Sequence, residues 1–160
     1  MIEKNISAEK RETLALFIAS GAYVGAAPAA PGTFGTLAAL PLWWLLSHVS
    51  AAWFFLLLLL LTILAVWAAG QAERILHQPD SGVIVIDEIV GLLLAAALVP
   101  FTWPHVVAAF LLFRFFDILK PFPVSWCDQN LHGGFGVVVD DLVAGIMAHL
   151  VLRLLMMAGF

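Results

Sequence analysis

Five stretches of the sequence are almost entirely apolar, and short polar or turn-rich segments separate them. They cover residues 34–48, 52–70, 88–101, 105–118 and 141–158. The second stretch has close to the roughly 20 residues that an α-helix needs to cross the hydrocarbon of a bilayer. The third and fourth are shorter, so they predict a tight helical hairpin or a crossing of a locally thin bilayer. The pattern predicts an all-α fold, a polytopic membrane bundle of four to five apolar segments.

The N-terminal region has two possible interpretations. Residues 13–30 have the apolar run and the small residues of a cleaved signal peptide. The charged residues before them argue against cleavage, because acidic and basic side chains cancel where a signal peptide is positive. We therefore expect an amphipathic N-terminal helix, with Ser7 as its N-cap and Glu9 in its first turn.

The composition agrees with a single membrane-embedded domain over residues 1–160. Hydrophobic residues make up 63% of the chain and charged residues only 11%, whereas a soluble domain has about 45–50% and about 25%. The net charge of −4 provides no basic surface, so nucleic acid is not an expected partner. Cys127 is the single cysteine, which excludes an internal disulfide and a cysteine-rich metal site. The oligomeric state is left open.

Threading the five segments back and forth through a bilayer predicts which loops share a side. The N-terminus and the loops at 71–87 and 119–140 fall on one side, together with most of the Lys and Arg residues. Because Lys and Arg are enriched in cytoplasmic loops, this side is expected to face the cytoplasm. The same side receives seven carboxylates, at Asp80, Asp87, Glu88, Asp117, Asp128, Asp140 and Asp141. Carboxylates beside apolar segments are costly unless paired, solvated or ion-bound, so they indicate a site.

The first polar cluster is the acidic pair Asp87-Glu88 in the stretch SGVIVIDEIVG. At the start of a helix, these negative charges would lie at the positive end of the helix dipole. Gly91, one turn later, would let another backbone or a ligand approach closely. The pair is therefore either a structural helix cap or part of a site.

The second cluster is the row Arg114, Asp117 and Lys120 in FRFFDILKPFP. Positions i, i+3 and i+6 share one side of a helix, and Pro121 ends that helix or kinks it. The row is either a ladder of structural salt bridges or a pair of phosphate-binding cations that flank a metal ligand.

The third cluster runs from Asp128 through HGGFGVVVDDLVAG. His132 lies in a glycine-rich turn whose amides could bind an anion, or it is simply solvated. Asp140 and Asp141 precede a helical run, with Gly145 one turn beyond Asp141. The stretches VIDEIVG and VVDDLVAG both contain an acidic pair, an aliphatic pair and a glycine, which indicates a shared local geometry.

The stretch APGTFGT at 30–36 opens the first apolar segment. We expect Pro31 and Gly32 to prevent a regular helix there and to leave backbone N–H groups free. Thr33 and Thr36 add hydroxyl donors, and the helix start that follows favours an anion. The stretch is either a phosphate cradle or a loop that only joins two helices.

Together the clusters indicate metal-dependent phosphate chemistry. Hard oxygen ligands without cysteine select Mg²⁺, Mn²⁺ or Ca²⁺ over zinc or copper. A metal offsets the charge of a phosphate and acidifies a water molecule, while Arg and Lys stabilise charge on the phosphoryl oxygens. A small membrane transporter and a non-catalytic membrane scaffold with an acidic ion site are the alternatives. The gathering of the acids at one face argues against a transporter, whose site lies near the bilayer midplane.

Four motifs, in this order, resemble the phosphatidylglycerophosphatase A family: GAAPAAPGTFGTLAALP, DSGVIVIDEIVG, FRFFDILKPFP and DQNLHGGFGVVVDDLVAG. The resemblance covers roughly residues 17–158. It implies a Mg²⁺-dependent lipid phosphatase of the bacterial inner membrane, without a cysteine nucleophile. The implied reaction converts the phospholipid phosphatidylglycerophosphate into phosphatidylglycerol and inorganic phosphate. Its site would face the cytoplasm, with the acyl chains left in the bilayer.

A specific hypothesis for the site follows from the clusters and the resemblance. One or two Mg²⁺ ions would be held by Asp87, Glu88, Asp117, Asp140 and Asp141. Phosphoryl oxygens would be bound by Arg114 and Lys120, with help from the amides of Gly32 and Thr33. Asp128 would be a further ligand or a base, and His132 would protonate the leaving glycerol oxygen. Attack by water and an aspartyl-phosphate formed on Asp117 or Asp128 both stay open.

Overall fold

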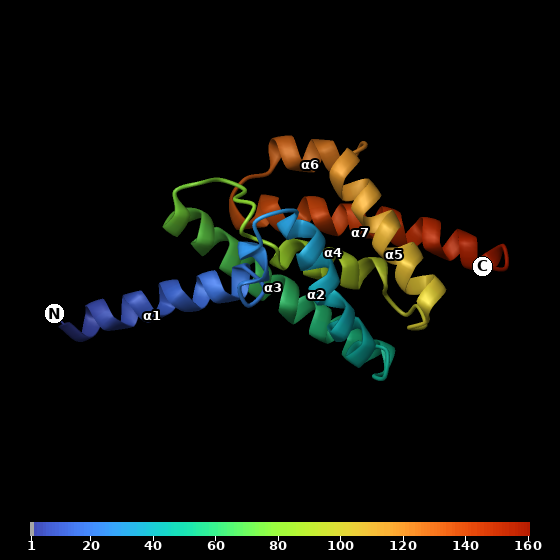
Figure 1. Ribbon diagram of the computed structural model, residues 1–160, viewed down its shortest axis with the longest axis horizontal. Coiled ribbons are helices and arrows are strands. Elements are labelled where there is room, and N and C mark those ends of the chain that lie inside the picture. Colours follow the sequence, from blue (N-terminus) through green and yellow to red (C-terminus); the bar gives the residue numbers. More distant parts are fainter. Residues whose placement is uncertain (1) are drawn as a thin grey trace.

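The computed structural model describes residues 2–160, and side chains from residue 9 onward, as a helical protein without strands (Figure 1). Its α-helices are α1 (Ile2–Ala19), α2 (Pro31–Leu46), α3 (Ala51–Leu76), α4 (Ile86–Ala95), α5 (Trp103–Leu119), α6 (Val124–Asn130) and α7 (Gly133–Met157). A short 3₁₀ helix, η1 (Val24–Ala26), lies between α1 and α2. The all-α prediction is therefore confirmed for the described residues.

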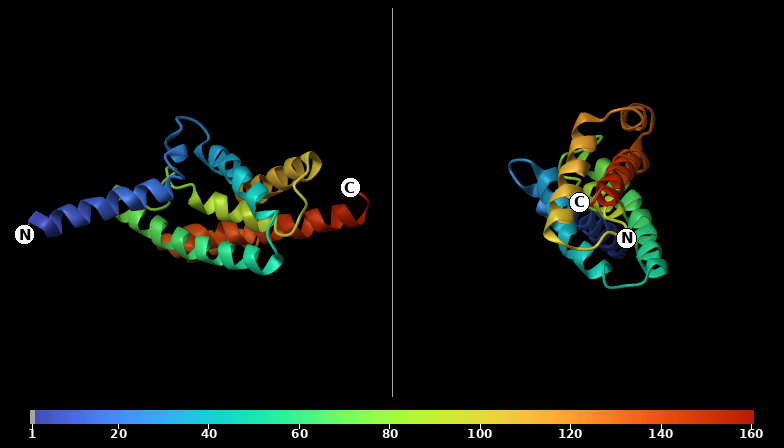
Figure 2. Two further views of the ribbon diagram at one scale, coloured as in Figure 1. Left: turned by 90° about the horizontal axis from the view of Figure 1, so that it is seen from below. Right: turned by 90° about the vertical axis from the view of Figure 1, so that its right-hand side faces the viewer.

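Helix α4 is the centre of the bundle. Nearly all of its ten residues are buried, and it packs against α2, α3, α5 and α7 (Figures 1 and 2). Beyond Asp87 and Glu88 in its first turn, α4 is apolar around its whole circumference, so no face of it suits water and other helices enclose it. The most extensive contact is with α7, which crosses the whole bundle.

The five predicted apolar segments lie in α2, α3, α4, α5 and α7, but not all of them are long enough to cross a membrane. Only α3 and α7, with 26 and 25 residues, are long and apolar enough to be candidate spans among the described helices. Helix α4 has ten residues, a length of about 15 Å at 1.5 Å per residue, which is half the hydrocarbon thickness. The expectation of four to five membrane segments is thus supported only in part.

Two helix boundaries differ from the prediction. Helix α2 begins at Pro31, so the expectation that Pro31 and Gly32 prevent a regular helix is wrong. The first helical position needs no N–H donor, and the fixed φ of proline already suits a helix. Helix α1 begins at Ile2, which places Ser7 inside the helix rather than at its N-cap.

The connections at one end of the bundle lie together, away from the acidic residues. Arg153 near the end of α7 donates hydrogen bonds to the carbonyls of Ala97 and Leu98 after α4. The ring of Phe160 stacks near His105 at the start of α5, with centroids 6.1 Å apart. The carboxylates singled out in the sequence belong to the opposite end.

Candidate active site

The backbones of α4 and α7 touch where each has a glycine. A Cβ atom added at Gly145 would lie 2.4 Å from the carbonyl oxygen of Gly91. One added at Gly91 would lie 2.9 Å from the carbonyl oxygen of Asp141, and closer still to the ring of Phe113. Gly91 therefore admits another backbone, one of the two possibilities expected from the sequence. Asp87 and Asp141 each lie one turn before these glycines, so the contact brings their side chains together.

Three carboxylates from the two helices form one group. Ligand atoms of Asp87, Glu88 and Asp141 all lie within 4.8 Å of one another. Asp87 and Asp141 are only 7% and 4% exposed. One oxygen of each of the three side chains is buried and has no hydrogen-bond partner among the described residues. Below, the three-carboxylate group means these three side chains.

Buried carboxylate oxygens without donors are unfavourable, because ionised groups lose hydration and repel one another. A hard divalent cation would compensate both effects, and carboxylate oxygens are the ligands that Mg²⁺ prefers. The donors, their burial and their unpartnered oxygens therefore fit a divalent metal ion.

Arg114 and Asp117 on α5 border the three-carboxylate group. Nη1 of Arg114 donates to Oδ2 of Asp117 at 2.5 Å and lies 3.7 Å from Oε1 of Glu88. Nε of Arg114 is buried and has no partner in the described part of the chain. One cation is thus shared between two carboxylates and still has an unused donor, an arrangement suited to a further anion.

Lys120 belongs to a second group and does not continue the row of Arg114 and Asp117. It caps α5 in the left-handed conformation, with φ of 41°, and pairs with Asp128 and Asp140. Its Nζ lies 2.6 Å from Oδ2 of Asp140. Burial alone would lower the pKa of Lys120, but the hydrogen bonds to these two carboxylates outweigh it and hold the pKa above its usual value. Lys120 is therefore a fixed cation.

Asp140 and Asp141 serve different groups although they are adjacent. Successive helix residues point about 100° apart, so Asp141 lies in the three-carboxylate group and Asp140 pairs with Lys120. Oδ1 of Asp140 is buried and unpartnered among the described residues. The structure thus does not bring Asp140, or Asp117, into the set of three ligands that it does assemble.

The first turn of α2 lies against the site. A Cβ atom at Gly32 would lie 2.1 Å from Oε1 of Glu88 and 3.0 Å from Nη1 of Arg114. The N–H of Thr33 donates to the carbonyl of Ala30 at 3.0 Å, and the hydroxyl of Thr36 donates to the carbonyl of Gly32 at 2.7 Å. Gly32 is therefore next to the charged groups, whereas the amide of Thr33 is already occupied and the expectation that it is free is wrong.

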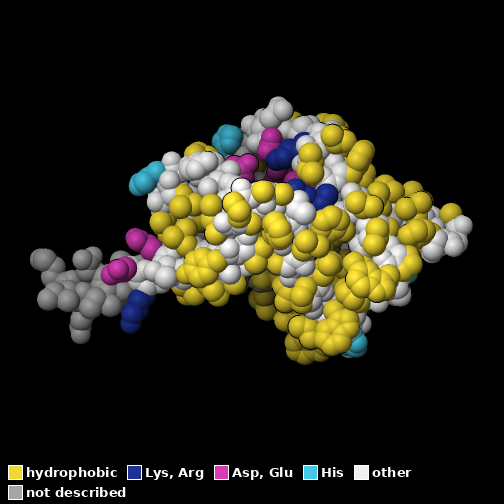
Figure 3. Space-filling model, in the orientation of Figure 1, with side chains coloured by type: hydrophobic (Ala, Val, Ile, Leu, Met, Phe, Trp, Pro, Cys, Tyr) yellow, Lys and Arg dark blue, Asp and Glu magenta, His cyan; other side chains and the backbone are white. Residues whose placement is uncertain are grey.

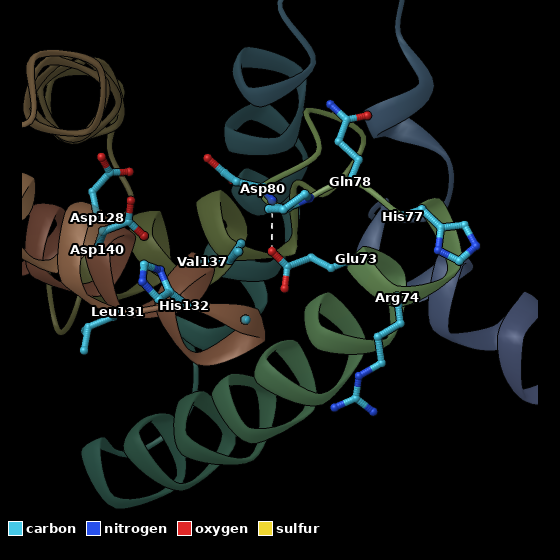
Figure 4. A pocket seen from close by; sticks show the side chains of 13 residues that line it. Glu73, Arg74, His77, Gln78, Asp80, Asp128, Leu131, His132, Val137 and Asp140 are labelled. Atoms are coloured by element: carbon cyan, nitrogen blue, oxygen red, sulfur yellow. Dashed lines mark hydrogen bonds between the residues drawn. The ribbon is translucent and has the colours of Figure 1, made fainter.

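A cleft of about 600 Å³ adjoins the Lys120 group (Figure 4). Asp128, His132 and Asp140 line one side of it, and Glu73 and Asp80 line the other. An oxygen of Glu73 accepts the backbone N–H of Asp80 at 2.9 Å. The sequence prediction did not include Glu73. The signal that could have found it is an acid at the polar end of the longest apolar segment.

The surface around these groups is mostly apolar. Figure 3 shows acidic and basic side chains in a hollow that hydrophobic side chains border on this face. Large apolar side chains on α3 and α5 are well exposed, among them Trp53, Leu59, Leu111 and Ile118. Two long apolar helices and this exposure are compatible with a protein that associates with a membrane.

Fold and site together define a helical, apolar protein with a buried acidic group bordered by Arg114, and a second group in which Lys120 pairs with two carboxylates. Residues 17–156 match the family described as phosphatidylglycerophosphatase A. The chain belongs to this family, and it is accordingly a phosphatase that acts on phosphoric monoesters.

Individual relatives agree with the family match. Phosphatidylglycerophosphatase A of Escherichia coli is 36% identical over 132 residues, which cover 82% of this chain and 77% of the relative. The protein of the same name from Haemophilus influenzae is 40% identical over 124 residues, 76% of each chain. A Bacteroides thetaiotaomicron protein with the provisional name phosphatidylinositol-3-phosphatase is 36% identical over 148 residues, 87% of this chain and 91% of the relative. No solved structure matches this chain significantly.

Proposed function

We propose that this chain is a Mg²⁺-dependent lipid phosphatase that converts phosphatidylglycerophosphate into phosphatidylglycerol and inorganic phosphate. The family and the names of two relatives support the substrate. The observation that carries the proposal is the three-carboxylate group: its ligand atoms lie within 4.8 Å of one another, and one buried oxygen of each side chain has no donor among the described residues.

Asp87, Glu88 and Asp141 would hold the metal ion, and Asp117 would join them or orient Arg114. When bound, Mg²⁺ would neutralise phosphate charge and lower the pKa of a water molecule. The metal requirement follows from charge: without a cation, the same carboxylates would repel an anionic substrate.

Arg114 and Lys120 would bind the phosphoryl oxygens, and Gly32 would let the phosphate approach the positive end of α2. The unused Nε of Arg114 provides one donor. The start of α2 is the positive end of its helix dipole, which favours an anion there. These groups stabilise charge that develops on the phosphoryl group as it is transferred.

Proton transfer would take place at the cleft. Asp128 would accept a proton from the attacking water, and His132 would give one to the glycerol oxygen as its bond to phosphorus breaks. Asp117 and Asp128 each already pair with a cation, so we favour attack by water over an aspartyl-phosphate. With a substrate whose phosphoryl group is chiral, a single displacement by water should invert the configuration at phosphorus; retention would indicate two displacements through an aspartyl-phosphate and would contradict direct attack by water.

The assay that tests the proposal is phosphate release by the purified chain in detergent. With phosphatidylglycerophosphate and Mg²⁺, we expect steady release of phosphate; EDTA should abolish it and added Mg²⁺ should restore it, because the carboxylates repel the substrate without a cation. A transporter or a scaffold would release no phosphate under any condition. Phosphatidylinositol 3-phosphate is the matched second substrate, and its preferred hydrolysis would contradict the proposed headgroup.

The site is proposed to face the cytoplasm of a bacterial inner membrane, in line with the distribution of Lys and Arg. His77 and His48 are exposed and belong to opposite ends of the bundle. We expect a cysteine at position 77 to be labelled by an impermeant thiol reagent only from the cytoplasm, and one at position 48 only from outside. Labelling of both from the same side would contradict this orientation.

A further inference from the structure

The seam between α4 and α7 continues beyond the two glycines, to residues that the proposed chemistry does not use. Asp141, Gly145, His149 and Arg153 follow one another at intervals of four along α7, so they share one face. The first meets the acidic start of α4, and the last two meet its end. An ionisable residue within an apolar span is costly and calls for a functional explanation.

A continuous hydrogen-bond network joins these two side chains to the end of α4. Nδ1 of His149 lies 3.0 Å from the carbonyl oxygen of Ala95, and Nε of Arg153 lies 3.4 Å from Nε2 of His149. Nη2 of Arg153 donates to the carbonyls of Ala97 and Leu98, both at 3.1 Å. Because a carbonyl only accepts, Nδ1 of His149 must have the proton, which leaves Nε2 to accept from Arg153.

These contacts provide what α4 lacks by itself. The last carbonyls of a helix have no partners within the helix and form its negative end. At the end of α4, the N–H of Ala96 reaches the carbonyls of Leu92 and Leu94, and the partner of the Ala95 carbonyl is His149. His149 binds the carbonyl of Ala95 at the end of α4, and Arg153 binds the turn that follows; both residues belong to α7, so together they fix the position of α4 along the axis of α7.

We propose that His149 and Arg153 are positioning residues that hold α4 in register along α7, so that Asp87 and Glu88 meet Asp141. This inference rests on the proposed function of the three-carboxylate group. A slip of α4 by one helical turn would move its carboxylates by about 5.4 Å, more than the 4.8 Å that now contains the ligand atoms. Smaller shifts would loosen the group, because metal ligands depend on the contacts that orient them.

The test measures Mn²⁺ binding by the purified full-length chain in detergent, from the electron paramagnetic resonance signal of free Mn²⁺. Arg153→Met keeps an unbranched apolar stem but removes every donor, and it is expected to weaken Mn²⁺ binding about tenfold. Arg153→Lys keeps a cation that can reach a carbonyl, so it should restore part of the affinity. Leu154→Ala is the matched control, because Leu154 is 64% exposed on the same turn of α7; its affinity should equal that of the wild type.

A purely structural role for Arg153 gives a different result. In that case Arg153→Met lowers the melting temperature of the metal-free chain but leaves the Mn²⁺ affinity at the wild-type value, which would overturn the proposal. If Arg153→Met does not fold, the Mn²⁺ affinities of His149→Leu and His149→Asn test the proposal instead. Only the asparagine can still donate to the carbonyl of Ala95, so it should retain the affinity that the leucine loses.

Phosphate release measured beside Mn²⁺ binding separates the two proposals. A wild-type chain that binds no Mn²⁺ and releases no phosphate contradicts the proposed function. An active wild type, with Arg153 and His149 variants that bind Mn²⁺ as tightly, contradicts only the positioning role.

Discussion

Replacement of Asp141 by asparagine is expected to reduce phosphate release by at least about 100-fold, because loss of a metal ligand should exceed the loss caused by residues that only support ligands. Asparagine has nearly the same shape but no charge. Asp141 is 4% exposed, and its Oδ2 has no donor among the described residues. In EDTA, removal of this buried charge beside Asp87 and Glu88 should raise the melting temperature in detergent. Phosphate release should therefore fall while the melting temperature of the metal-free protein rises.

Glu9→Gln is the control for Asp141→Asn. Glu9 is exposed on α1, so loss of its charge should change neither turnover nor melting. Wild-type turnover in Asp141→Asn would show that Asp141 is not a ligand. If the metal-free variant melted at a lower temperature than the metal-free wild type, the Asp141 carboxylate would not be an unfavourable buried charge in the absence of a cation.

Gly145→Ala is expected to separate α4 from α7. The new Cβ would lie 2.4 Å from the carbonyl oxygen of Gly91, and a backbone atom cannot rotate away. Such overpacking costs about 1–3 kcal/mol, of which the better helix propensity of alanine returns up to about 1 kcal/mol. We expect the melting temperature to fall. Phosphate release should fall as well, even at temperatures where the variant is folded, because Asp87 moves away from Asp141.

Gly82→Ala is the matched control for this effect. A Cβ at Gly82 would have Pro31 Cγ as its nearest neighbour, at 3.9 Å, which is an ordinary contact. This variant should melt and turn over like the wild type. If Gly145→Ala also behaved like the wild type, the close approach of the two helices would not be what places the carboxylates.

The sequence predicts the helices and the gathering of acids well, for simple physical reasons. Long apolar stretches can satisfy their backbone only as helices, and a back-and-forth path alternates the ends at which loops lie. From the sequence we expect Gly91 to admit another backbone or a ligand, and the structure shows that it admits the backbone of α7 at Gly145 and Asp141. From those two segments the structure groups Asp87, Glu88 and Asp141, which are three of the five carboxylates that the sequence hypothesis assigns to the metal.

Features that depend on packing are not readable from the sequence. The apolarity of α4 fits both a membrane segment and a buried core helix, and its ten residues make it the latter. Lys120 does not share a helix face with Arg114 and Asp117 as the spacing predicts. It adopts a left-handed conformation at the end of α5 and pairs with Asp128 and Asp140. The rotation of a helix about its axis decides such partners, and tertiary contacts set that rotation.

The most direct test of the account is anomalous diffraction from crystals of the active chain grown with Mn²⁺. The account predicts a peak about 2.1 Å from carboxylate oxygens of Asp87, Glu88 and Asp141. The same peak should be absent from crystals of Asp141→Asn. If crystals of the active protein showed Mn²⁺ bound elsewhere, with Asp87, Glu88 and Asp141 free of metal, the claim that these three carboxylates hold the metal would be contradicted.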